Sequence, residues 1–277
     1  MRHLSAAVRR ARFRDQTVRQ ALVWLRYKRA HLNAEDTFLV SYPRSGTTWL
    51  RFLLFESFTK ESPSFGHIKE AVPSLTKHRD AAVVLGQQGR LIQSHEVYSD
   101  GDRRIIYAVR DARSVALSEY QWQRRSGLEP GSLDRFIRDF TRGKSNPWGA
   151  WDQHVRFWLE SEPALNQHLH LVKFEDLKRD PVASLRGVLE FLGVGMSTSE
   201  LQVVVANNRV ERMRAKEDEA RSQGWRSTAR SDIRFVNQGK AESWRDGLTQ
   251  GQRRAIEEHF GSTLERLGYL APRASQR

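Results

Sequence analysis

Two hydrophobic patterns alternate along the middle of the chain, and they predict strands and helices in turn. Short apolar runs predict buried strands at residues 38–42, 90–94, 104–110 and 169–174. Apolar residues at helical spacing predict helices at 47–56 and 112–123, each directly after a strand. Because strands that alternate with helices are typical of βαβ units, we expect an α/β fold of three layers, with a mainly parallel central sheet flanked by helices.

Capping residues mark the ends of two helices. Asp111 is suited to cap the helix at 112–123. Asp180 as N-cap, Pro181 at the first helical position and Gly193 at the end predict a helix from 181 to 192. The stretch 209–231 is polar and highly charged, and we interpret it as a mobile surface segment.

The ends of the chain differ from its middle. Residues 1–34 carry nine basic side chains and one acidic one, and their apolar residues recur at helical steps, which predicts a basic amphipathic helical arm. Two roles stay open for the arm: packing on the rest of the chain, or peripheral contact with an anionic membrane face. We expect one domain at 35–270 and a flexible tail at 271–277.

Composition narrows the classes of function. The chain has 277 residues, of which 39% are hydrophobic, and this fits a globular protein with a sizeable core. No apolar run approaches the roughly 18 residues of a membrane-spanning helix. The absence of cysteine excludes disulfides, thiolate metal sites and a cysteine nucleophile, and it suits a cytoplasmic location. The net charge of +13 favours anionic partners, such as nucleotides, acidic polymers, nucleic acid or a membrane face.

A loop of small and hydroxyl residues joins the first predicted strand to the helix at 47–56. It reads Ser41-Tyr42-Pro43-Arg44-Ser45-Gly46-Thr47-Thr48-Trp49. A strand-to-helix turn of this kind presents backbone N–H groups to an anion. Relative to the ATP-binding pattern G-x-x-x-x-G-K-[ST], Gly46 and Thr48 are kept, but Thr47 replaces the Lys. Since Arg44 supplies a cation inside the loop, we expect a nucleotide with one phosphate-like group there rather than ATP.

Two further polar residues lie at or just beyond the ends of predicted strands, and a third lies on the helix that follows one of them. Arg110 ends a strand and Ser118 lies on the helix that follows, so the two could grip one phosphate; a solvated Arg and a surface Ser are the alternative. His95 directly follows the strand at 90–94, at the edge where open α/β sheets place their ligands. Its position is compatible with a catalytic role, and a surface or packing role is the alternative.

Together, and in this order, these features resemble the cytosolic-type sulfotransferases that use 3′-phosphoadenosine 5′-phosphosulfate (PAPS). The loop at 42–49 is similar to the family's site for the 5′-phosphosulfate, and Arg110 with Ser118 is similar to its 3′-phosphate site. His95 falls where the family carries its catalytic histidine. The resemblance spans residues 38–249. It implies a P-loop-type fold for the predicted domain, and transfer of a sulfuryl group to a hydroxyl or amine.

The resemblance also implies residue roles. His95 would take the proton of the acceptor, and Arg44 would stabilise charge on the leaving group. The residues implied to bind PAPS are Arg44, Ser45, Gly46, Thr47, Thr48, Trp49, Arg110, Ser118, Gln238, Gly239 and Lys240. No metal is expected, because side chains supply the cations. An imidazole with its ordinary pKa of about 6.5 is mostly neutral at pH 7.5, as a base requires.

The C-terminal part departs from the family pattern. The usual Arg-Lys-Gly is replaced by Asn-Gln-Gly at 237–239, so Lys240 and Arg234 are candidates for the missing cation. The Phe that the family carries near the adenine is replaced by Val210, which leaves Trp49 as a stacking face.

Two other functions stay open. The first is an ATP-dependent small-molecule kinase on the same fold, which the missing Lys of the loop disfavours. The second is a non-enzymatic polyanion- or nucleic-acid-binding protein, suggested by the charge alone, with no recognition signature for a specific nucleic acid. The sequence carries no readable code for the acceptor, which could be a small molecule, a lipid or a carbohydrate.

Overall fold

The computed structural model describes residues 22–25, 31–75, 85, 89–99, 101, 103–225, 234–236 and 240–271. In this part of the chain, four parallel strands form one sheet with the order β2-β1-β3-β4. They are β1 (Thr37–Ser41), β2 (Leu91–Ser94), β3 (Ile105–Val109) and β4 (Leu169–Lys173). The prediction of an α/β fold with a parallel sheet is confirmed.

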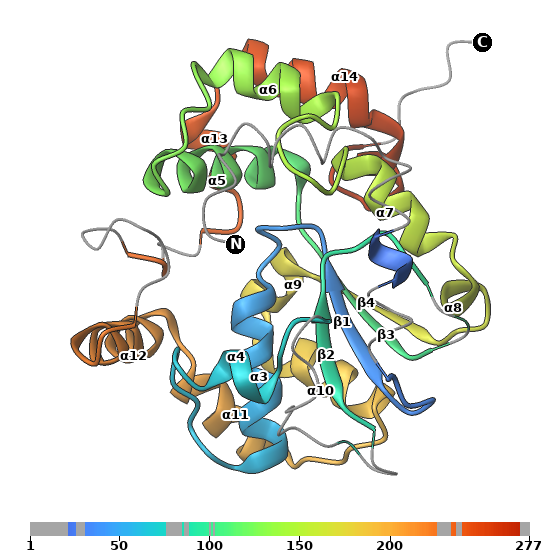
Figure 1. The fold of residues 1–277 in the computed structure, drawn as a ribbon, viewed down its shortest axis with the longest axis vertical. Helices are drawn as coiled ribbons and strands as arrows, with labels where there is room; N and C mark the ends of the chain where they lie inside the picture. The colour runs from blue at the N-terminus through green and yellow to red at the C-terminus, as the bar shows by residue number, and fades with distance from the viewer. Residues whose placement is uncertain are drawn as a thin grey trace.

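Helices cover both faces of the sheet (Figure 1). The first layer contains α5 (Ala112–Arg125), α6 (Leu133–Thr141), α7 (Trp151–Leu159), α13 (Trp244–Gly247) and α14 (Gln250–Arg266). The second layer contains α3 (Thr47–Thr59), α4 (Ile68–Ala71), α9 (Phe174–Arg179), α10 (Pro181–Phe191), α11 (Thr198–Asn207) and α12 (Val210–Ser222). The short α8 (Glu162–Leu165) precedes β4.

The strands show why the sequence produces three layers. Successive side chains of a strand point to opposite faces of the sheet. In β1, Phe38 and Val40 belong to the core of the first layer, whereas Leu39 belongs to the core of the second. All residues of β1, β2 and β3 are buried. A strand that is covered on both faces is apolar along most of its length, which is the pattern that predicted it.

The predicted helix caps are confirmed. The Asp111 carboxylate accepts a hydrogen bond from the amide of Arg113 at 2.8 Å, and the Asp180 carboxylate accepts one from the amide of Ala183 at 2.9 Å. Gly193, just beyond α10, has a φ of 74°, a left-handed conformation that glycine adopts without steric cost.

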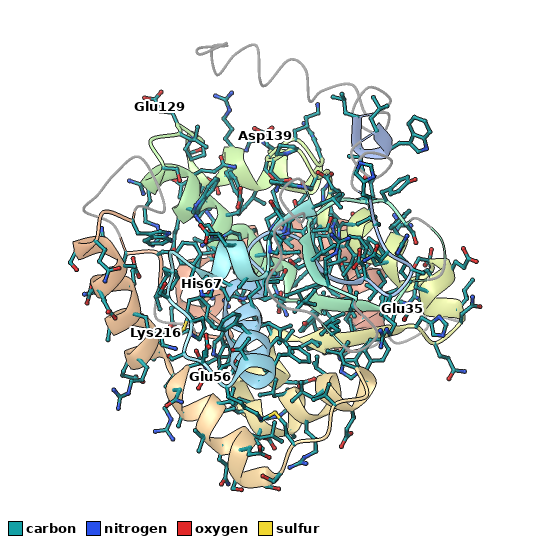
Figure 2. All side chains as sticks on the ribbon, turned by 60° about the horizontal axis from the view of Figure 1, so that its bottom comes forward. Glu35, Glu56, His67, Glu129, Asp139 and Lys216 are labelled. Atoms are coloured by element: carbon teal, nitrogen blue, oxygen red, sulfur yellow. The ribbon has the colours of Figure 1, made fainter. Side chains whose placement is uncertain are left out.

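The interpretation of 209–231 as a mobile surface segment was wrong for most of its length, because α12 occupies residues 210–222. Met213, Glu217 and Ala220 are at most 4% exposed and recur at helical spacing, so they form one buried face. On the same helix, the Lys216 ammonium lies 4.0 Å from the buried Glu56 carboxylate of α3, and Figure 2 shows these two side chains next to each other. Residues 226–231 lie outside the described part.

Most of the predicted N-terminal arm also lies outside the described residues, which include only 22–25 and 31–34 of it. Residues 22–25 are helical, and Val23 is 4% exposed and packs in the first layer. None of the described helices is both long and apolar enough to cross a membrane. The domain boundaries and the tail at 271–277, of which only residue 271 is described, stay predictions.

Candidate functional site

The loop between β1 and α3 leaves a row of amides without partners. Arg44 and Gly46 adopt left-handed backbone conformations, with φ values of 72° and 91°. The amides of residues 45–48 find no backbone acceptor within the described ranges. Since these N–H groups lie at the N-terminus of the 13-residue helix α3, they are suited to bind the oxygens of an anion.

Gly46 has no room for a side chain. A Cβ atom added there would lie 2.4 Å from Cδ2 of Phe174, the first residue of α9. The same Phe174 ring lies under the guanidinium of Arg110, with 4.5 Å between Cζ and the ring centroid. The ring therefore fixes the loop and the cation together.

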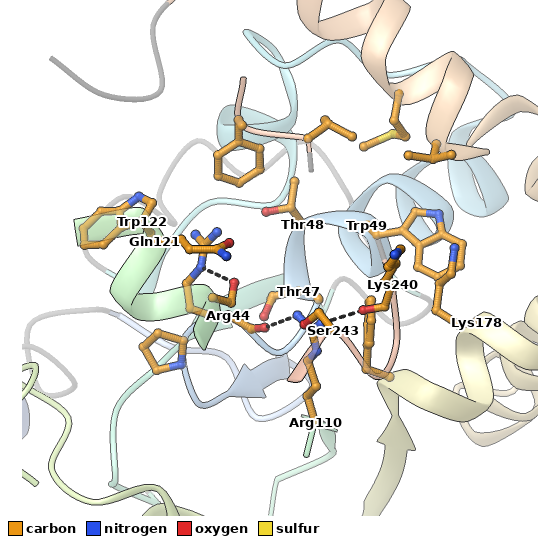
Figure 3. Close-up of a pocket in the computed structure, with 18 of the residues that line it drawn as sticks. Arg44, Thr47, Thr48, Trp49, Arg110, Gln121, Trp122, Lys178, Lys240 and Ser243 are labelled. Atoms are coloured by element: carbon orange, nitrogen blue, oxygen red, sulfur yellow. Dashed lines mark hydrogen bonds between the residues drawn. The ribbon is translucent and has the colours of Figure 1, made fainter. Parts of the chain in front are cut away.

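Arg44 lies between Arg110 and Ser118, the two residues that the sequence analysis paired for a phosphate, and it contacts both. Arg110 donates from Nη1 to the carbonyl oxygen of Arg44 at 3.3 Å and from Nη2 to the carbonyl oxygen of Lys240 at 2.9 Å. The Nε of Arg44 donates to the Ser118 hydroxyl at 3.3 Å. Figure 3 shows the Arg44 side chain extending toward Gln121 and Trp122 of α5.

Buried polar atoms in this group indicate a missing anionic partner. The Nε of Arg110 and the Oγ of Ser45 are buried and make no hydrogen bond with the described residues. Desolvation lowers the pKa of Arg44 to about 10, against the opposing charge of Glu119, so Arg44 remains a cation at neutral pH. Because buried polar groups are normally satisfied, two cations beside unpaired donors fit a phosphate-bearing ligand.

His95, just beyond β2, is held in one tautomer. Its Nδ1 lies 2.7 Å from the carbonyl oxygen of Ser41 and 3.2 Å from the Ser41 hydroxyl. A carbonyl can only accept a hydrogen bond, so Nδ1 carries the proton and Nε2 keeps its lone pair. No described residue is bonded to Nε2. Desolvation lowers the pKa of His95 to about 4, and the positive charges of Arg51 and Arg44 contribute, so the imidazole is neutral at pH 7.

Ser41 connects this imidazole to the loop. Its hydroxyl contacts both the Thr47 hydroxyl and the His95 ring. The ring of Trp148 meets the His95 ring edge-on, with 5.5 Å between centroids. Ser41 therefore holds the His95 imidazole in a fixed position relative to the loop.

Trp49 lies at another end of the site, and a buried polar cluster fixes it. Its indole N–H donates to the carbonyl oxygen of Asn208 at 2.8 Å. Asn208 is fully buried; its amide donates to the Glu56 carboxylate at 2.8 Å and accepts from Lys216 at 3.0 Å. The Lys178 ammonium lies 5.2 Å from the centroid of the Trp49 ring. The sequence analysis did not relate Asn208, Glu56, Lys216 or Lys178 to Trp49.

A cavity of about 1320 Å³ joins these groups. Of the predicted site residues, its lining contains Arg44, Gly46, Thr47, Thr48, Trp49, His95, Arg110, Ser118 and Lys240. Four further cations line it, namely Arg124, Arg125, Lys178 and Arg209. A weaker signal existed for Lys178, because it lies on α9, the helix that directly follows the carboxyl end of β4.

The structure separates the two candidates for the missing C-terminal cation. Both form exposed ion pairs, Arg234 with Asp218 at 2.9 Å and Lys240 with Asp246 at 3.4 Å, but of the two only Lys240 lines the cavity. Gln238 and Gly239 lie outside the described residues. Within the described ranges, no group of three or more His, Asp or Glu side chains is arranged to hold a metal ion.

The fold and the site define a parallel α/β protein with a loop of amides suited to an anion and a neutral histidine at one edge of its sheet. A model of the sulfotransferase domain matches residues 34–268, so the chain belongs to the sulfotransferase family. The predictions of the family and of a sulfotransferase enzyme are thereby confirmed.

Relatives with known activity match most of the chain. Sulfotransferase 1C2 of Homo sapiens is 22% identical over 267 residues, which cover 87% of each chain. Sulfotransferase 2A6 of Rattus norvegicus is 27% identical over 239 residues, which cover 82% of this chain and 83% of the relative.

Solved structures share the fold. Mouse sulfotransferase SULT7A1 complexed with PAP superposes with a TM-score of 0.65 at 23% identity, over 86% of this chain and 88% of the other. A retinol dehydratase in complex with androsterone and the inactive cofactor PAP gives a TM-score of 0.66 at 18% identity, over 91% and 86% of the two chains.

Proposed function

We propose that this sulfotransferase moves a sulfuryl group from PAPS to a hydroxyl or amine, with His95 as the base. The observation that carries the proposal is the tautomer of His95. Its Nδ1–H is committed to the Ser41 carbonyl, and its unprotonated Nε2 belongs to a residue that lines the same cavity as the anion-binding loop. Two solved relatives of the same fold hold PAP, which we take as adenosine 3′,5′-bisphosphate, the product that PAPS would leave.

The chain's own residues fit the donor. The loop amides of residues 45–48 and the cation of Arg44 suit the 5′-phosphosulfate. Arg110 and Ser118 suit the 3′-phosphate, and Lys240, which lines the same cavity, is our candidate to replace the family's missing pair. Trp49 offers the flat face for the adenine.

The mechanism we infer is an in-line transfer. PAPS supplies the sulfuryl group and a stable leaving group. Nε2 of His95 accepts the proton of the acceptor hydroxyl or amine while the acceptor atom bonds to sulfur. The bond from sulfur to the bridging oxygen breaks, and its electron pair stays on the bisphosphate. Arg44 and the loop amides stabilise the charge that develops there, because they are already in position.

The first test is the donor. Incubation with PAPS and a panel of small-molecule, lipid-headgroup and carbohydrate acceptors, read by mass spectrometry, should show addition of one sulfuryl group. Matched reactions with ATP should show no phosphoryl transfer. Phosphorylated products would instead favour the kinase. DNA binding that depends steeply on salt, without transfer from either donor, would favour the polyanion-binding protein.

The second test is the base. His95→Ala should lower kcat by about 100-fold or more, because a positioned base contributes typically 10²–10⁴-fold. Affinity for the bisphosphate should stay almost intact. The control is His259→Ala, an exposed histidine of α14, which should keep the parental kcat. Near-parental kcat in His95→Ala at saturating acceptor would remove His95 from the mechanism.

A further inference from the structure

A second buried histidine lies directly behind His95. His154, on α7, is fully buried. Its Nε2 lies 3.2 Å from the backbone carbonyl oxygen of His95, and its Nδ1 lies 2.9 Å from the hydroxyl of Tyr107 on β3. The chain Tyr107–His154–His95 therefore connects the centre of the sheet to the backbone of the base.

The direction of both hydrogen bonds follows from the chemistry of the groups. The His95 carbonyl can only accept, so Nε2 of His154 carries the proton and donates it. In a neutral imidazole Nδ1 is then an acceptor, and the Tyr107 hydroxyl donates to it. Burial raises the pKa of Tyr107 well above its ordinary value, so this hydroxyl keeps its proton. The two hydrogen bonds therefore select a single tautomer of the neutral imidazole.

The rings around His154 hold it in place. Its ring stacks on Tyr107 with 5.8 Å between centroids and meets Tyr42 edge-on at 5.5 Å. Tyr42, in the loop after β1, donates its hydroxyl to the carbonyl oxygen of Gly149 at 3.0 Å and accepts from the Asn146 amide at 2.8 Å. His154 is thus packed between β3 and the loop after β1.

We propose that His154 and Tyr107 are positioning residues for sulfuryl transfer, which hold the backbone of His95 so that Nε2 of the base stays in line with the acceptor. This inference rests on the proposed role of His95. Ser41 fixes the ring of the base, and His154 fixes its backbone, so the two contacts together define where Nε2 lies. Positioning of this kind matters because an error of about 1 Å in a reacting group can cost about 100-fold in rate.

The central variant is His154→Phe, which keeps a ring of similar size and removes both hydrogen bonds. It should lower kcat about tenfold and leave the affinity for the bisphosphate unchanged, since it frees the His95 carbonyl from its buried donor. His154→Gln should recover most of kcat, because its amide can donate to that carbonyl again. A role confined to stability predicts no such recovery of kcat per folded molecule.

A double-mutant cycle tests the chain of contacts. Tyr107→Phe should lower kcat severalfold in the parent but not in the His154→Phe background, because its hydroxyl reaches His95 only through His154. If His154→Phe does not fold, the milder Tyr107→Phe decides alone: lowered kcat with intact bisphosphate affinity supports the proposal, and parental kcat overturns it.

The matched control is Val155→Ala, the next residue on α7, which is fully buried and has no polar side-chain atom. It should lower the free energy of unfolding without changing kcat of the folded enzyme. Equal kcat in His154→Phe and Val155→Ala overturns the proposal. His95→Ala in the same series separates the proposal for the base from the proposal for its positioning residues. If His95→Ala retains turnover, the proposed base is wrong. If His95→Ala loses turnover and the His154 and Tyr107 variants do not, only the positioning role is wrong.

Discussion

A histidine with an ordinary pKa of about 6.5 loses its neutral form in weak acid. The surroundings of His95 lower its pKa to about 4, mainly by desolvation and further by the charges of Arg51 and Arg44. A lowered pKa favours the neutral form, which is the form that accepts a proton. Burial therefore extends the working range of the proposed base toward acid, a property that the sequence alone does not give.

The corresponding prediction concerns kcat/KM, which reports on the free enzyme. Between pH 8 and about pH 5 the contribution of His95 to kcat/KM should be constant, and it should fall as the pH approaches 4. An ordinary imidazole would already have lost about tenfold by pH 5.5. Initial rates at low PAPS and acceptor, measured in buffers of constant ionic strength, distinguish the two. A midpoint near pH 6.5 would contradict the desolvated state of His95.

Gly46 supports a second prediction, because its backbone is left-handed and the Phe174 ring leaves no room for a Cβ atom there. Gly46→Ala forces a non-glycine residue into φ 91° and places Cβ 2.4 Å from the Phe174 ring. We expect weaker bisphosphate binding, measured by calorimetry, and a loss of more than about 2 kcal/mol in the free energy of unfolding.

The matched control is Gly193→Ala, where φ is 74° but an added Cβ meets nothing within 4 Å. It should cost about 1 kcal/mol through backbone strain alone and leave bisphosphate affinity unchanged. Equal losses in the two variants would mean that the contact with Phe174 does not matter.

The site residues that the sequence predicted lie at strand ends or on the helix that follows, whereas those it missed pair across long stretches of the chain. Arg110 and His95 stand at strand ends, and Ser118 follows on the next helix, so local pattern and the rule for parallel sheets were enough to group them. Asn208 and Glu56 lie 152 positions apart, and nothing local to either residue relates them. Their pairing depends on how α11 packs against α3, which requires the three-dimensional structure.

Among the elements, α12 shows how charge can conceal a packed helix. The buried face of α12 includes Glu217, which is fully buried although its type is typical of surfaces. The carboxylate accepts hydrogen bonds from two consecutive amides, those of Phe235 at 2.6 Å and Val236 at 2.8 Å. The Phe235 ring in turn lies 5.8 Å from the guanidinium carbon of Arg44. The helix therefore supports one wall of the cavity. The strands were predictable because both of their faces are apolar, whereas this helix face is not.

Glu217→Ala tests that support. It leaves the amides of Phe235 and Val236 without their buried acceptor, so the free energy of unfolding should fall by about 1–3 kcal/mol in urea titrations. Bisphosphate affinity should fall as well, because Phe235 packs against Arg44. Glu219→Ala, an exposed residue of the same helix, should change neither quantity by a measurable amount. Unchanged stability in Glu217→Ala would show that the segment 234–236 is held by other contacts.

For the whole molecule, the basic arm at 1–34 matters because its nine basic side chains and one acidic one supply +8 of the net charge of +13. Two of its described residues contact the core of the first layer: Val23, which is 4% exposed, and Leu32, which is partly buried against it. We therefore expect deletion of residues 1–30 to lower the thermal midpoint of unfolding without changing sedimentation with anionic liposomes. An unchanged thermal midpoint together with reduced sedimentation would assign the arm to a membrane surface.

The proposed donor site also belongs to the whole molecule, because its cations come from distant parts of the chain. Arg44 follows β1, Arg110 follows β3, and Lys240 precedes α13; the carbonyls of Arg44 and Lys240 both accept from Arg110. A ligand that bridges these segments binds only the folded state, so it must raise the free energy of unfolding. At a concentration of 100 times its Kd, adenosine 3′,5′-bisphosphate should add about 2.7 kcal/mol.

The last prediction removes the residue that joins these segments. Arg110→Ala should weaken bisphosphate binding about ten- to a hundredfold, because a charge-assisted contact with the 3′-phosphate is lost, and the thermal shift at a fixed ligand concentration should shrink accordingly. AMP, which lacks that phosphate, should bind the parent much more weakly than the bisphosphate and should lose little further affinity in Arg110→Ala. Arg138→Ala, an exposed cation on α6, controls for the change in net charge. If the parent bound AMP and the bisphosphate equally, Arg110 would have only the structural role of joining the carbonyls of Arg44 and Lys240.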